Sequence, residues 1–75
     1  MTEIEYEMVK KTWRDAREAL AACAFVIAED AVEGMVISDV RRERFRSLMT
    51  AHEAAGKALD AAMTMYHAGL VTKAL

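Results

Sequence analysis

Apolar residues recur at alternating spacings of three and four along the first half of the chain, which is typical of a helix that buries one face. These residues are Tyr6, Val9, Trp13, Ala16, Leu20, Cys23 and Ile27. Thr2 and Glu5 have the spacing of a capping box, and Gly34 can adopt the left-handed conformation that follows a helix. The pattern predicts a helix over about residues 2–33.

Helical spacing returns in the second half, where the large apolar residues are Phe45, Leu48, Met49, Leu59, Met63 and Tyr66. Ser38 and Asp39 are both good N-caps, and Gly69 marks the expected end. We expect a helix over about residues 39–69, a turn at 34–38 and a short tail at 70–75. Because the connection is short, the two helices should be antiparallel. The fold class is all-α, a helical hairpin of one domain spanning residues 1–75, and folding it sets Tyr6 beside Tyr66.

The stretch ALAACAFVIA, residues 19–28, is apolar on every side of the first helix. One hairpin cannot cover all of it, so a second helical layer must come from another chain. We expect a homodimer that forms a four-helix bundle, since an identical chain is always present. A different partner protein is the competing explanation. The expected dimer interface comprises Trp13, Leu20, Phe25, Val26, Ile27 and Leu59.

Composition supports a small helical protein that needs reinforcement. The 75 residues include no proline, three glycines and a single cysteine, so no intrachain disulfide can form. Chains of this size usually depend on oligomerisation or very regular packing. The balance of 10 basic and 12 acidic residues creates no field that attracts nucleic acid or lipid. The apolar run is too short to cross a membrane, and the acidic start, MTEIEYE, does not resemble a secretory signal, so we expect a cytoplasmic protein.

The predicted turn is unusual because Met35, Val36 and Ile37 are apolar where turns are normally polar. One interpretation is that they fold back as a lid on the end of the bundle. The other is that they form part of a surface that binds a partner, for which methionine is well suited.

Four arginines lie in the first turns of the second helix, where positive charge is unfavourable to the helix dipole. They are Arg41, Arg42, Arg44 and Arg46. One hypothesis is that they pair with Glu29, Asp30 and Glu33 at the end of the first helix. The alternative is that they bind a partner carboxylate or the phosphates of a nucleic acid.

Catalytic and cofactor motifs are weak. The stretch HEAAG begins like a zinc-protease motif, but Gly56 stands where the second histidine is required. His52 falls on the apolar seam, where we expect it to be hydrogen-bonded to a neighbour. Cys23 is expected to be a buried, inert thiol, and no nucleophile, base and acid fall at usable spacings. We therefore expect no enzyme activity, no metal and no cofactor.

Two functions are compatible with these features. The first is a non-catalytic interaction module, a regulator, inhibitor or adaptor of a larger protein, of the kind often encoded by phages or plasmids. The second is nucleic-acid binding through the arginines. In architecture alone the hairpin resembles the Rop family of plasmid copy-number regulators, which implies dimerisation and contact with RNA but carries over no site residues. Nearby acidic residues, including Glu43, would neutralise a phosphate-binding patch, and they favour the first function.

Overall fold

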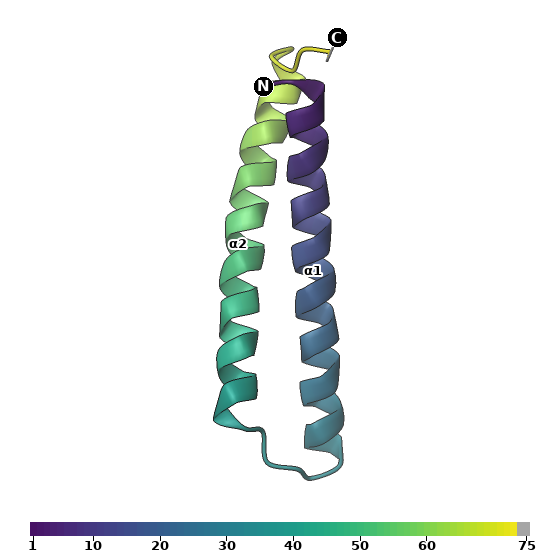
Figure 1. Ribbon diagram of the computed structural model, residues 1–75, viewed down its shortest axis with the longest axis vertical. Coiled ribbons are helices and arrows are strands. Elements are labelled where there is room, and N and C mark those ends of the chain that lie inside the picture. The colour runs from purple at the N-terminus through teal and green to yellow at the C-terminus, as the bar shows by residue number, and fades with distance from the viewer. Residues whose placement is uncertain (74–75) are drawn as a thin grey trace.

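Two long antiparallel helices make up the computed structural model, which describes residues 1–73 (Figure 1). Helix α1 spans Glu3–Val32 and helix α2 spans Asp39–His67. They pack against each other along a rod of 53 × 17 × 16 Å, with the connecting loop at one end and both chain termini at the other. The predicted all-α hairpin is confirmed. Residues 74 and 75 of the predicted tail lie outside the described residues.

The helix ends are fixed by local hydrogen bonds. The backbone N–H of Glu5 donates to the Thr2 hydroxyl, and the Thr2 backbone N–H donates to the Glu5 carboxylate, which completes the predicted capping box. At the other end, Gly34 has a φ of 75°, and the Met35 N–H donates to the Asp30 carbonyl at 2.8 Å. This is the Schellman motif that closes a helix on a left-handed glycine.

Helix α2 repeats this arrangement. The Ser38 hydroxyl accepts from the Arg41 N–H at 3.2 Å and caps the start. Gly69, with a φ of 74°, ends the helix, and the Leu70 N–H donates to the Met65 carbonyl. The helix stops at His67, two residues short of the predicted end, because the left-handed glycine must follow the last helical turn rather than belong to it.

The centre of the hairpin contains small side chains. Among the described residues only Ala55 and Ala62 are buried, at 7% and 1% exposure, and no large side chain is fully buried. Met49 and Met63, which the periodicity places on the seam, are instead exposed. An alanine at the closest approach lets the two helices come together, and the longer methionine side chains then fall on the flank.

Both termini are joined by a short parallel bridge between Thr2 and Thr72. The Glu3 N–H donates to the Thr72 carbonyl at 2.7 Å, and the Thr72 N–H donates to the Met1 carbonyl at 3.0 Å. Nearby, the rings of Tyr6 and Tyr66 stack with centroids 5.1 Å apart, which confirms the predicted pairing. The tail therefore closes the open end of the hairpin, an interaction that the sequence pattern did not indicate.

The capping box makes stability depend on pH. The hydrogen bond from the Thr2 backbone lowers the pKa of Glu5 below its usual 4.5, with a smaller contribution from the Thr2 side chain. A pKa that is lower in the folded chain contributes stability above its unfolded value, and this contribution is lost as the pH falls through the folded value. We expect Glu5→Gln to lose less stability than the wild type between about pH 7 and about pH 3.

Urea unfolding of both proteins at one fixed protein concentration measures this difference. The glutamine can still accept the Thr2 N–H, so it is a matched control that lacks only the titrating proton. Equal losses in the two proteins would show that Glu5 does not contribute to the acid sensitivity.

Candidate functional site

The most distinctive surface surrounds the loop. Five large apolar side chains are exposed there, and we call them the loop-end surface: Phe25, Val32, Met35, Val36 and Val40. Val36 and Val32 are 91% and 87% exposed, close to the values of free side chains. This end of the rod lies farthest from the chain termini (Figure 1). Phe25 and Val32 line one shallow hollow on α1, and Val40 lines another on α2, so several exposed apolar side chains share this end of the rod. Such a concentration of exposed apolar surface is a candidate site of interaction.

The geometry of the loop explains the exposure. After the glycine of the Schellman motif, three residues without helical structure, 35–37, carry the chain across to the Ser38 cap. Ile37 is half-buried, whereas Met35 and Val36 extend into solvent. Met35 and Val36 therefore do not fold back as a lid, and Ile37 is the one residue of the three that is partly shielded from solvent. Val40, the second residue of α2, is also exposed but was missing from the predicted partner-binding residues, although it lies three residues after the apolar turn.

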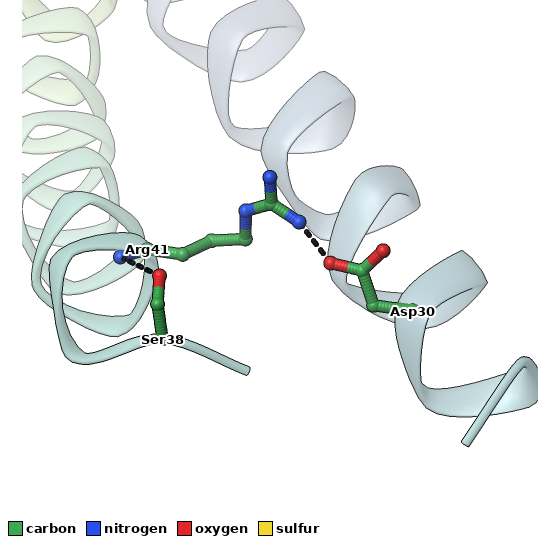
Figure 2. Close-up of polar contacts among 3 residues, drawn as sticks. All are labelled: Asp30, Ser38 and Arg41. Atoms are coloured by element: carbon green, nitrogen blue, oxygen red, sulfur yellow. Dashed lines mark hydrogen bonds and ion pairs between the residues drawn. The ribbon is translucent and has the colours of Figure 1, made fainter. Parts of the chain in front are cut away.

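The arginine cluster is partly neutralised. The Arg41 guanidinium reaches across from α2 and pairs with the Asp30 carboxylate near the end of α1, while the Ser38 hydroxyl holds the Arg41 backbone (Figure 2). The Asp30 side chain is only 16% exposed. This contact confirms the predicted pairing for one arginine. It also places opposite charges together at the ends where each opposes its own helix dipole.

The other arginines do not form one patch. Arg46 approaches Glu43 of its own helix at 3.4 Å, and within residues 1–73 no ion pair involves Arg42 or Arg44. Two helix positions two residues apart differ by about 200° around the axis, so Arg42 and Arg44 point to opposite flanks of the hairpin. A duplex backbone would need these charges on one side.

The residues expected at a dimer interface fall into two groups. Trp13, Leu20, Ile27 and Leu59 are half-buried within the hairpin, whereas Phe25 is 66% exposed and Val26 is also exposed. Trp13 contacts its own chain: its ring centroid lies 6.1 Å from that of His52, and the Arg17 guanidinium stacks 4.8 Å from the ring centroid. Trp13 therefore anchors the hairpin itself.

His52 lacks the hydrogen bond expected for it. Its Nε2 atom is buried and has no hydrogen-bond partner among the described residues. A buried polar atom without a partner costs about 1 to 3 kcal/mol relative to an apolar group of similar shape. The histidine is held by packing beside Trp13 rather than by a polar contact.

We expect His52→Leu to raise the free energy of unfolding by about 1 to 3 kcal/mol, because it removes the unpartnered nitrogen and retains an apolar side chain at the seam. Chemical denaturation followed by circular dichroism measures this. His67→Leu, at an exposed position in the last turn of α2, is the control and should give no gain. A loss of stability in the His52 variant would show that Nε2 has a partner in solution.

The end with the termini carries a second, more polar group of side chains. Lys10 lies over the Tyr6 ring, 5.0 Å from its centroid, and forms an ion pair with Glu7 at 2.8 Å. The hydrogen bond to Glu7 raises the pKa of Lys10 above 10.5. Ile4 and Met8 are exposed beside a shallow groove that Lys11 and Arg14 also line. The predicted seam omits both residues, because they fall outside its period.

Residues 1–73 contain no group of three or more histidine, cysteine or acidic side chains that could hold a metal ion. Cys23 is a half-buried free thiol. Over the same residues, neither helix combines the length and the apolar character needed to cross a membrane.

Comparisons with known proteins return nothing for this chain: no family model matches it, and no curated protein or solved structure matches it significantly.

Proposed function

We propose that this chain is a small, non-catalytic interaction protein of the cytoplasm, which works as a homodimer and binds a larger protein through its loop-end surface. The role that fits best is that of a regulator, inhibitor or adaptor. The observation that carries the proposal is the gathering of exposed Val32, Met35, Val36 and Val40 at one end of the rod. An apolar cluster on a small protein loses contact with water when a partner covers it.

The small number of buried residues in a single hairpin supports the proposal of a dimer. Two buried alanines in the described residues are a small core for a chain of 75 residues. Chains of this size gain stability by adding a second packed layer, and a closed twofold pair is the commonest way to do so.

Site-specific photo-crosslinking tests the binding of a target. A photoreactive amino acid at Val36 should join the chain to a defined larger protein in cells that express it. The matched control is the same amino acid at Lys57, an exposed position in the middle of α2. Adding Val40→Glu to the Val36 probe should abolish the product without reducing helicity, because a charge would enter the apolar contact. Equal products from both positions, or none from Val36, would contradict the proposal.

The alternative, RNA binding through Arg41, Arg42, Arg44 and Arg46, has less support. Arg41 and Arg46 are already in ion pairs, and the other two arginines diverge. Phosphate contacts are strongly salt-dependent, so retention on RNA that weakens with added salt and disappears in Arg42→Glu with Arg46→Glu would favour this alternative.

A further inference from the structure

We propose that a second copy of this chain covers one particular flank of the hairpin, with both loops at the same end of the resulting four-helix bundle. This inference rests on the proposed function, which calls for a dimer but leaves its face and orientation open. We call this orientation the shared-end arrangement. It predicts which side chains meet between the two copies.

The two flanks of the hairpin differ in chemistry. A helix turns by about 100° per residue, so the positions that face the other helix determine which positions lie on either side. One side carries Ala19, Ala22 and Val26 of α1, and a groove lined by these residues also includes Arg44 of α2. Continuing from Arg44 by helical steps of seven and three gives Ala51, Ala54 and Ala58. We call this side the alanine flank.

The opposite side is the charged flank. By the same period it carries Lys10, Arg14 and Arg17 of α1 together with Glu53 and Asp60 of α2. Covering it would remove five charges from water, which is costly unless each finds a partner. The alanine flank carries fewer charges, among them Asp15, Glu29 and Arg44, and most of its side chains are short, so another helix can approach it closely. Small side chains alone do not identify the occupant, and the symmetry of the pair supplies the further argument.

A twofold axis parallel to the helices cannot shift one copy along the rod relative to the other. In the shared-end arrangement each residue therefore keeps its height, and α1 of one copy packs on α2 of the second. Within one copy Asp30 lies level with Arg41, and Tyr6 lies level with Tyr66. Counting residues from these two pairs gives the position of every α1 residue along the rod relative to α2. The symmetry transfers the same positions to the second copy, so the register between the two copies is fixed.

At these fixed heights the two alanine flanks are complementary. Glu29 of one copy lies within about 3 Å, along the axis, of the height of Arg44 of the second. Further along the rod, Ala22 is level with Ala51 to the same tolerance, and Met8 is level with Met65. Opposite charges meet near the loops, alanines meet in the middle, and methionines meet near the termini. Asp15 is level with Ala58, and it keeps the ion pair with Lys11 of its own helix. Within residues 1–73, neither Glu29 nor Arg44 is in an ion pair inside its own hairpin.

The opposite orientation, with the loops at opposite ends, lacks this match. It packs α1 on α1 and α2 on α2. With the helices fully overlapped, Glu5 of one copy then falls opposite Glu29 of the other, and Arg44 falls opposite Ala61. Like charges repel, and a charge against an alanine loses water without gaining a partner. Charge complementarity therefore selects the shared-end arrangement.

A consequence for binding follows from the shared end. The two copies bring their loops together, so Met35, Val36 and Val40 appear twice around the twofold axis on one face. Phe25 and Val32 point away from α2 by the helical period and stay outside the dimer contact. The target would then meet a doubled loop-end surface, and a two-point attachment strengthens binding without new types of contact.

A distance measurement between two spin labels tests the orientation. Val36→Cys is labelled in a Cys23→Ser background, so each chain carries one label on an exposed loop residue. Neighbouring helices lie about 8 to 10 Å apart, so the shared-end arrangement predicts a label separation of about 10 to 30 Å. Because the rod is 53 Å long, loops at opposite ends would give a separation close to that length.

A charge exchange tests the contact. Arg44→Glu alone and Glu29→Arg alone should each weaken the dimer about tenfold in sedimentation equilibrium, since each replaces two symmetric attractions by repulsions. The two changes together should restore it to within about threefold. Both changes place a charge favourably against its helix dipole, so the folding of either helix is not at risk. Arg42→Glu, on the other flank, is the control and should leave the dimer unchanged.

The outcomes separate the two proposals. A short label distance together with rescue by the exchanged charges supports the shared-end arrangement. A long distance in an intact dimer overturns the arrangement and leaves the proposed dimer in place. A chain that is monomeric and helical at every concentration overturns both the arrangement and the dimer, while the photo-crosslinking at Val36 still decides whether the loop binds a target.

Discussion

Replacing Ala62 by aspartate is expected to lower the free energy of unfolding by about 3 to 5 kcal/mol, which is the cost of an uncompensated buried charge. Ala62 is 1% exposed and lies on the face of α2 that packs against α1. Small domains have a total stability of about 5 to 15 kcal/mol, and a 75-residue chain with so small a core belongs at the lower end of that range. The loss therefore removes most of its stability, and the variant should be largely unfolded at low urea concentration. Circular dichroism during urea titration measures the loss.

Ala21→Asp is the matched control for this prediction. Ala21 is exposed in the middle of α1, so the substitution there costs only the difference in helix propensity, less than about 1 kcal/mol. A similar loss in both variants would mean that helix propensity rather than burial determines the result. A well-folded Ala62→Asp protein would show that the two helices are not in contact at this height.

Removing the Trp13 side chain is expected to cost about 3 kcal/mol, at the lower end of the range for aromatic-to-alanine changes because the residue is half-buried. The ring lies against His52 and carries the Arg17 guanidinium over its face. Trp13→Ala therefore removes contacts with both helices and leaves a gap at the seam. Denaturation at a fixed protein concentration gives the change in stability.

Phe25→Ala provides the comparison, because it truncates another aromatic residue on the same helix. Phe25 is 66% exposed and points away from α2, so its loss should change stability by less than about 0.5 kcal/mol. A cost at Phe25 equal to that at Trp13 would show that a second copy covers this residue. The shared-end arrangement would then be wrong about the covered face.

The elements of the fold were predictable because their signals are local. Each helix end is recognised from a few neighbouring residues. The structure places the capping box of Thr2 and Glu5, the N-cap Ser38 and the left-handed Gly34 at the helix ends that their chemistry favours. The antiparallel pairing followed from the short loop. The stacking of Tyr6 on Tyr66 then followed from counting along both helices.

The composition of the seam on α2 was harder to predict. Met49 and Met63 are larger and more apolar than alanine, so periodicity favoured them, yet Ala55 and Ala62 occupy the buried positions. Alanine is common both on helix surfaces and at close helix contacts, and its sequence pattern does not separate the two roles. The bridge between Thr2 and Thr72 was missed for a related reason: it uses backbone groups, which every residue has.

The candidate site was predicted in part. Met35 and Val36 were selected because apolar residues are unusual in turns, and both are exposed. Ile37 belongs to the same run but is half-buried, since only a folded loop determines which of three neighbours turns inward. Pairing across the loop was one of two hypotheses for the arginines, and Arg41 does pair with Asp30. No pattern indicated which single arginine would reach across.

The bridge between Thr2 and Thr72 also determines how the molecule responds to mechanical load. Since both ends of the chain lie at one end of the rod, a force that separates them acts across the helices rather than along them. The two helices then separate from the terminal end toward the loop. The bridge and the stack of Tyr6 on Tyr66 break first, and each further pair of facing residues bears the force only after the preceding pair has separated. The loop end is the last part to feel the pull.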